Sequence, residues 1–181
     1  FVDDSDSYFT FELINNCIED KNIIDTRISE IRKKSTYSLG LDIARYGSDE
    51  TCYAICRWTH EYEGIEVVYI HSEEKRPTTH TTGFIKELHK VWAFEGIYVD
   101  ETALGGGVVD SLIQAGHSPH SVQFSGRPID TRYLNKRAEM WFAMAEWIKR
   151  GGSIPRIPEL LRELTEPTYY FVQGKFQLEP K

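Results

Sequence analysis

The sequence is short of the residues that mark disulfide-rich, zinc-binding and membrane-spanning proteins. Its 181 residues include three cysteines, Cys17, Cys52 and Cys56, and no CxxC pair. This small, odd number excludes a disulfide framework and a zinc knuckle, and it indicates a reducing compartment. No segment approaches the roughly 20 apolar residues of a membrane helix, and no charged-then-apolar leader opens the chain. We therefore expect a soluble protein.

Positive charge is also in deficit. The 21 lysines and arginines are outnumbered by 28 aspartates and glutamates, which gives a net charge of -7. Nucleic-acid-binding proteins are usually basic, so this balance counts against nucleic acid as a partner. It does not exclude a local basic patch, because Lys136, Arg137, Lys149 and Arg150 fall within one short segment.

Two common kinds of catalytic motif are missing. The sequence has no GxxxxGKS or GxxxxGKT loop, so it contains no P-loop nucleotide site. The six histidines are scattered, and only His117 and His120 lie close together. No Ser-His-Asp or Cys-His order stands out. A histidine metal centre and a nucleophilic triad are therefore both disfavoured.

What is present is enough apolar material for a packed core, arranged in distinct segments. Hydrophobic residues make up 40% of the chain and aromatic residues 13%. Residues 1–35 predict an acidic N-terminal arm with a short helix near 10–19, and the pattern changes at Tyr37. Apolar runs then predict strands, and helical periodicity predicts helices. Strands are expected at 37–44, 51–59, 64–72, 95–100 and 121–126, helices at 79–94, 132–152 and 155–164, a glycine-rich turn entering a helix at 105–116, and a β-hairpin at 168–179.

The order of these segments predicts the fold class. Three consecutive strands with short links are expected to be antiparallel, whereas later strands separated by helices are expected to be parallel. The result is an α/β protein with a mixed five-stranded sheet flanked by helices, followed by a C-terminal β-hairpin. This order resembles the ribonuclease-H-like fold, in which the first and fourth strands are parallel neighbours.

Two aspartates occupy the ends of predicted strands. Asp42 lies near the end of the first strand, and Asp100 ends the fourth. If these strands are parallel neighbours, their ends lie about 4.8 Å apart, and two carboxylates that close repel unless a cation lies between them. Oxygen ligands of this kind suit Mg²⁺ or Mn²⁺, and two such ions can activate a water and stabilise the leaving oxygen of a phosphodiester. The alternative is that Asp42 caps a turn and Asp100 is an ordinary strand-end residue.

Three further acidic residues are candidates for a third ligand or for support of the pair. Asp49 lies in the turn after the first strand, Glu101 follows Asp100, and Asp110 lies in the helix that follows a run of glycines. Asp49 and Asp110 also have a plainer interpretation, because both can simply face solvent. As the neighbour of Asp100, Glu101 is expected to point to the opposite face of the sheet.

Two segments are candidates for contact with phosphate groups. Gly105, Gly106 and Gly107 precede a helix, where backbone N–H groups can bind a phosphate, although a tight turn also requires glycine. Lys136 and Arg137 lie at the start of the clearest predicted helix, where cations oppose the helix dipole. A DNA phosphate backbone would compensate for that placement, and so would a surface salt bridge to a neighbouring carboxylate.

Four segments and the terminal hairpin together resemble the nuclease domain of the large terminase subunit of tailed bacteriophages. The segments are LGLDIARYGSDE, IYVDETALGGGVVDSL, YLNKRAEMW and GGSIPRIPELLREL, in that order over residues 37–181. The resemblance implies a ribonuclease-H-like, two-metal-ion endonuclease that cuts double-stranded concatemeric viral DNA at the start and end of genome packaging. It implies that Asp42 and Asp100 match the family's first two metal-binding aspartates, with Mg²⁺ or Mn²⁺ as the expected ions.

The resemblance also implies a domain organisation and a set of partners. Residues 1–35 would join a preceding packaging ATPase domain to a nuclease domain over 36–181. The family's third acidic residue lies after the hairpin, in a segment like SPDxxDA that this sequence does not contain, so the domain is expected to lack its C-terminal end. The expected partners are double-stranded DNA, the ATPase domain, the small terminase subunit and the portal, in the cytoplasm of an infected bacterium.

Two other functions stay open from the sequence. The same fold could serve only as a DNA- or portal-docking module of the packaging motor, which the missing third carboxylate favours. An actin-like or sugar-kinase-type ATPase has a similar GLDIA strand followed by a glycine turn. Such a protein also needs a second glycine-rich phosphate loop and an adenosine site, and neither is recognisable in the sequence.

Overall fold

The computed structural model describes residues 7–19, 35–44, 50–59, 64–74, 76–101 and 105–179. The chain forms two units. One, the sheet unit, consists of Lys21–Gln123, and the other, the helical unit, combines Phe1–Asp20 with Phe124–Lys181. No helix within the described ranges is both long enough and apolar enough to cross a lipid bilayer.

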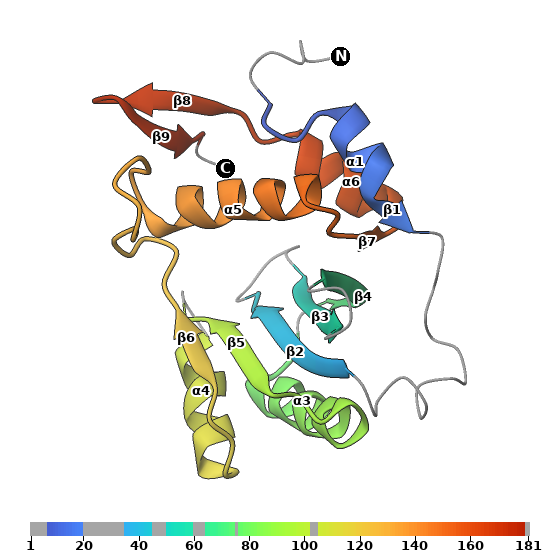
Figure 1. Ribbon diagram of the computed structural model, residues 1–181. Coiled ribbons are helices and arrows are strands. Elements are labelled where there is room, and N and C mark those ends of the chain that lie inside the picture. The colour runs from blue at the N-terminus through green and yellow to red at the C-terminus, as the bar shows by residue number, and fades with distance from the viewer. Residues whose placement is uncertain are drawn as a thin grey trace. The chain divides into compact units, whose positions relative to one another are not determined.

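A mixed five-stranded sheet forms the centre of the sheet unit (Figure 1). Its strands are β2 (Ser35–Asp42), β3 (Thr51–Thr59), β4 (Gly64–Glu73), β5 (Gly96–Asp100) and β6 (His120–Val122). They lie in the order β4-β3-β2-β5-β6. β3 pairs antiparallel with β2 and β4, whereas β5 runs parallel to β2, and β6 runs parallel to β5. The predicted fold class is confirmed, including the parallel pairing of the first and fourth predicted strands.

Side-chain alternation decides which face of the sheet is buried. On β2, Tyr37 and Leu41 are buried on one face, whereas Asp42 is exposed on the other. β2 is the central strand of the sheet, and its two faces are not equally buried. The apolar face packs against α3 (Thr78–Trp92) and α4 (Gly105–Gln114), whose side chains join those of the strands in one hydrophobic core.

The helical unit brings together residues from both ends of the chain. Its elements are α1 (Phe11–Cys17), β1 (Ile18–Glu19), α5 (Lys136–Lys149), β7 (Ile154–Pro155), α6 (Pro158–Thr165), β8 (Tyr169–Val172) and β9 (Lys175–Leu178) (Figure 1). β1 pairs in parallel with β7, and the ring of Tyr8 lies 4.3 Å from that of Phe142 on α5. Residues 7–19 thus pack with the C-terminal elements, a grouping that the predicted arm over 1–35 did not include.

Local chemistry sets the ends of α5 and the turn of the hairpin. Asn135 Oδ1 accepts a hydrogen bond from Ala138 N at 2.9 Å, so the helix begins directly after this cap, later than the sequence predicted. Gly151, with a φ of 97°, follows the helix as its stop signal. The β8–β9 hairpin turns at Gln173 and Gly174, which both have positive φ, as predicted.

Candidate active site

Asp42 and Asp100 lie at the ends of two neighbouring parallel strands. The last register pair between β2 and β5 is Leu41 with Val99, and each aspartate is the next residue along its strand. The two aspartates therefore occupy equivalent positions at one edge of the sheet. Because Leu41 and Val99 are buried on the helix-covered face, the aspartates belong to the opposite face.

The two carboxylates have different environments. Asp100 is 9% exposed, whereas Asp42 is open to solvent. The same row of the sheet continues through Cys52, the register partner of Asp42, and through Val122, the partner of Asp100. One carboxylate is therefore held within the protein while its neighbour faces outward. Two adjacent carboxylates suit a hard cation, because the cation offsets the repulsion between their charges.

Two carboxylates, those of Asp42 and Asp100, lie at equivalent positions here, and the described residues add no third metal-ligating side chain to them. Within the ranges that the structure describes, no group of three or more His, Cys, Asp or Glu side chains is arranged to hold a metal ion. The aspartate pair matches the oxygen donors that Mg²⁺ and Mn²⁺ prefer. It fits such an ion as part of a site that needs further ligands.

The other predicted acidic candidates lie elsewhere or outside the described residues. Glu101 accepts a hydrogen bond from Gln123 Nε2 at 3.1 Å, and its backbone N–H donates to Val122 O at 3.0 Å. Asp110 is exposed on α4. Asp49 falls outside the described residues. The structure therefore does not group Glu101 or Asp110 with the aspartate pair.

Glycine at position 105 is required by a close approach to Asp100. A Cβ on Gly105 would lie 1.7 Å from the carbonyl oxygen of Asp100 and 2.7 Å from its carbonyl carbon. α4 thus begins against the backbone of the last residue of β5, and this close approach gives position 105 a steric reason for glycine. A Cβ on Gly106 or Gly107 would meet no atom within 4 Å, so crowding does not explain those two glycines.

The strand end that carries Asp42 is held by Thr51, which the sequence did not single out. Thr51 is 2% exposed, and its Oγ1 accepts a hydrogen bond from Ala44 N at 3.2 Å. This bond ties the residues that follow Asp42 to the start of β3. Threonine is common in strands, so a buried threonine at a strand start has no distinctive signal in the sequence.

Glu73, at the end of β4, is a further acidic residue at this end of the sheet. Tyr53 Oη donates a hydrogen bond to Glu73 Oε1 at 2.7 Å, and His80 Nδ1 of α3 lies 3.5 Å from the same oxygen. Burial, together with the bond to Glu73, raises the pKa of Tyr53. Tyr53 pairs with Leu41 on the helix-covered face of the sheet. Glu73, which contacts Tyr53 and His80, therefore links β4 to α3 on the face opposite the aspartate pair.

The predicted DNA-binding cations lie at the start of α5, in the helical unit. Lys136 Nζ forms an ion pair with Glu139, the kind of surface salt bridge that the sequence left as the alternative. Arg137 Nη1 donates a hydrogen bond to Glu179 O at 3.3 Å. The bonds from Lys136 and from the backbone N–H of Asp130 lower the pKa of Glu139. Lys136 is thereby neutralised by a carboxylate, whereas Arg137 binds a neutral carbonyl.

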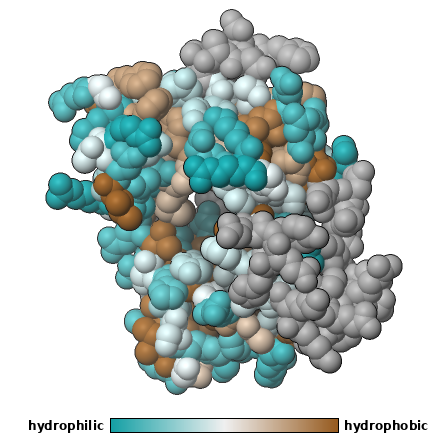
Figure 2. All heavy atoms as spheres, in the orientation of Figure 1, coloured by the Kyte–Doolittle hydropathy of each residue, from teal (hydrophilic) through white to brown (hydrophobic). Residues whose placement is uncertain are grey.

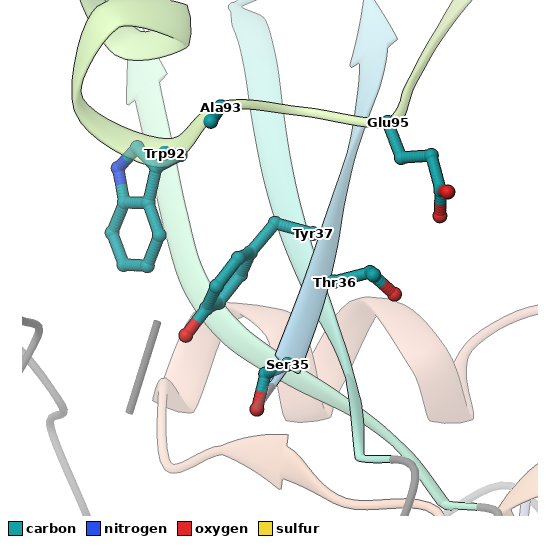
Figure 3. A pocket seen from close by; sticks show the side chains of 6 residues that line it. All are labelled: Ser35, Thr36, Tyr37, Trp92, Ala93 and Glu95. Carbon is teal, nitrogen blue, oxygen red and sulfur yellow. The ribbon is translucent and has the colours of Figure 1, made fainter. Parts of the chain in front are cut away.

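A cavity of about 330 Å³ lies at the start of β2, at the opposite end of the strand from Asp42. Figure 3 shows the rings of Tyr37 and Trp92 on one side of β2 and the side chains of Thr36 and Glu95 on the other. Neither member of the aspartate pair lines this cavity. It therefore does not serve as a substrate pocket for chemistry at the pair.

Solved structures with the same architecture include nuclease domains from three bacteriophages. The nuclease domain of the large terminase subunit gp2 of bacterial virus Sf6 matches with a TM-score of 0.70 and 14% identity, covering 97% of this chain and 88% of that chain. This is the fold of a large-terminase nuclease domain. The large terminase nuclease from thermophilic phage G20c with bound magnesium matches with a TM-score of 0.67 and 13% identity, covering 98% of this chain and 89% of that chain. The large terminase nuclease domain from Thermus phage P74-26 matches with a TM-score of 0.67 and 14% identity, covering 95% of this chain and 84% of that chain.

These structures, at 13–14% identity, show that the chain shares their fold, and they are nuclease domains of the kind that the sequence resembles. No protein-family model matches the sequence, and neither does any curated protein. The terminase nuclease fold positions the strand ends that carry Asp42 and Asp100.

Proposed function

We propose that this chain is a metal-dependent endonuclease that cleaves double-stranded viral DNA during genome packaging. The observation that carries the proposal is the placement of Asp42 and Asp100 at equivalent positions on neighbouring parallel strands of a terminase nuclease fold. The Sf6 and G20c nuclease domains have been solved with manganese, magnesium and cobalt, which supports metal dependence here. Two-metal-ion cleavage of concatemeric DNA is the finer form of the same proposal.

Asp42 and Asp100 are the residues that would hold the metal. When bound, Mg²⁺ or Mn²⁺ supplies an activated water and neutralises negative charge on the phosphodiester. The protein fixes the carboxylates, because Gly105 sets α4 against the backbone of Asp100 and Thr51 ties down the chain after Asp42. The exposed Asp42 leaves one side of the site open to substrate. A third carboxylate from a segment like SPDxxDA, beyond the hairpin, would complete the ligand set.

DNA contacts are part of the proposal at two places. The first turn of α4 presents backbone N–H groups, and the open space around Gly106 and Gly107 leaves room for a phosphate. In the helical unit, Arg137 is the better candidate of the two cations because Lys136 already forms an ion pair. In the whole protein, the packaging ATPase domain, the small terminase subunit and the portal are the proposed partners, in the cytoplasm of the infected host.

Plasmid nicking with Mn²⁺ tests this function. We expect nicking by the wild-type chain and its loss in Asp42→Ala and Asp100→Ala. We expect its retention in Glu87→Ala, a control carboxylate on α3 whose side chain is 67% exposed. Asp42→Ala is the cleaner variant, because an exposed side chain contributes little to packing. Undiminished nicking in both aspartate variants would refute the assignment.

A non-catalytic docking module is the second candidate, and the shortage of carboxylates favours it. In the described part of the chain, the aspartate pair does not belong to a group of three metal-ligating side chains. Duplex DNA binding without Mn²⁺-dependent nicking, in this chain and in a longer one that includes the segment after the hairpin, would favour docking over cleavage.

A further inference from the structure

One isoleucine stands out on the surface of the helical unit. Among the described large apolar side chains, Ile129 is the most exposed, at 89%. Figure 2 shows hydrophobic residues scattered among hydrophilic ones over the visible face, and a single exposed apolar residue is ordinary on such a surface. The way in which the backbone of Ile129 is held is not ordinary.

The carboxylate of Glu139 holds the tip of the loop that carries Ile129. Glu139 Oε1 accepts hydrogen bonds from Ile129 N at 2.9 Å and from Asp130 N at 2.7 Å. Asp130 in turn accepts bonds from the backbone N of Arg132 at 2.9 Å and from its Nε at 2.8 Å. The backbone on both sides of the Ile129 side chain is therefore fixed before any partner arrives.

The flanks of the same loop, residues 124–134, are also fixed. Backbone N–H groups in the first turn of α5 donate to the carbonyls of Gly126 and Phe124 at 2.8 and 2.9 Å. Phe176 of the hairpin exchanges two backbone hydrogen bonds with the loop, at 2.9 and 2.8 Å. Figure 1 shows the loop beside the first turn of α5. A contact residue on a loop ordered in this way loses little further conformational entropy on binding.

Positive charge accompanies this apolar side chain. Residues 124–139, which include the Glu139 that holds the loop, contain four basic residues and two acidic residues, a net charge of +2 in a chain of net charge -7. Arg132 pairs with Asp130, whereas Arg127 is exposed and has no ion pair within the described residues. Ile129 is separated from Arg127 only by Pro128, whose ring restricts the backbone between them. The loop thus offers one aliphatic and one cationic contact at a fixed spacing.

We propose that Ile129 is an apolar DNA contact, seated against sugar and base edges of the duplex, with Arg127 on an adjacent phosphate. Aliphatic side chains serve as wedges between base steps, while arginines position the protein on the backbone. The local excess of positive charge favours duplex DNA, a polyanion, over a protein as the partner. The inference rests on the proposed function for its substrate, and it adds a contact residue that takes no part in metal binding.

Equilibrium binding to a fluorescent duplex in EDTA, followed by anisotropy over a salt series, tests the contact without cleavage. We expect Ile129→Ser to weaken binding by about tenfold, because it removes an apolar side chain from a buried contact, and to leave the salt slope unchanged. Ile129→Leu should restore affinity. Arg127→Gln should reduce the salt slope by about 0.9, the value for one lost phosphate contact. The control is Ile113→Ser, which changes another exposed isoleucine, at 55%, on α4.

The outcomes separate this contact from the nuclease function. Ile129 is so exposed that Ile129→Ser should unfold at the wild-type temperature, so a binding loss would not reflect misfolding. Wild-type affinity in Ile129→Ser, or an equal loss in Ile113→Ser, would overturn the contact even if Mn²⁺-dependent nicking is present. Binding that depends on Ile129 in a chain without nicking would uphold the contact and refute only the nuclease.

Discussion

Gly105→Ala tests how the sheet edge beneath the aspartate pair is built. The new Cβ would lie 1.7 Å from the carbonyl oxygen of Asp100, whereas close carbon–oxygen contacts in proteins are about 3.3 Å. The start of α4 or the end of β5 must therefore shift by about 1.6 Å to restore a normal contact. The obstacle is backbone, so no side-chain rotation relieves it. Overpacking of this kind costs about 1–3 kcal/mol, occasionally more, and we expect about 3 kcal/mol.

Thermal unfolding measures this cost against a matched glycine. For a protein of this size, each kcal/mol lowers the midpoint by about 2–4 °C, so Gly105→Ala should unfold roughly 6–12 °C below wild type. Gly83→Ala is the control, because a Cβ there meets no atom within 4 Å on α3. Alanine in place of a helical glycine stabilises by up to about 1 kcal/mol, so this variant should unfold slightly above wild type.

The same shift should displace Asp100 from its place beside Asp42. Mn²⁺-dependent nicking, measured well below both unfolding midpoints, should therefore fall in Gly105→Ala and stay at the wild-type level in Gly83→Ala. A Gly105→Ala variant that unfolds at or above the wild-type temperature would show that residue 105 does not lie against the Asp100 carbonyl, and the reasoning would fail.

Three further predictions concern single contacts. Thr51→Val removes the acceptor for Ala44 N and should lower the free energy of unfolding by about 1–2 kcal/mol in urea denaturation. Thr51→Ser keeps the hydroxyl and should keep most of the free energy of unfolding. Equal losses of stability in Thr51→Val and Thr51→Ser would contradict the role of the hydroxyl. Asn135→Ala removes the cap of α5 and should cost about 1 kcal/mol, visible as a lower thermal midpoint. Because the folded state lowers the pKa of Glu139, its stabilising contribution is present above the ordinary glutamate pKa and is lost as the pH falls through the lowered value. Glu139→Gln should therefore reduce the loss of unfolding free energy that the wild-type protein shows as the pH is lowered. The same loss in the wild type and the variant, measured by urea denaturation at several acidic pH values, would count against this ion pair.

The strand ends that form the candidate site could be predicted from local patterns. The apolar run before Asp100 stops at that residue, whereas the run around Asp42 continues through Ile43 and Ala44, so the sequence placed Asp42 only near its strand end. The short and long links between strands indicate which neighbours are antiparallel or parallel. The packing of residues 7–19 could not be predicted in this way. It depends on contacts between distant positions, such as the ring of Tyr8 against Phe142, and no local periodicity reports such a contact.

The candidate contact residues show a second limit of the sequence. Three consecutive glycines suit both a phosphate site and a steric need, and only the approach of the Asp100 carbonyl distinguishes Gly105 from the two that follow. The sequence also left two interpretations of Lys136, because an ion pair with Glu139 depends on side-chain conformations that the sequence does not specify. The role of Asp49 stays a prediction.

The division of the chain has a consequence for its synthesis. The helical unit is discontinuous, and the whole sheet unit lies between its two parts in the sequence. Ser7 Oγ, for example, donates to Thr165 O, 158 positions away. The sheet unit is therefore complete in the sequence before α5 is added, whereas Phe9 and Ile14, both buried in the finished protein, must wait for their partners. The nascent chain thus carries an uncovered apolar segment until translation nears the hairpin, and this is the interval in which chaperones or aggregation would compete for it.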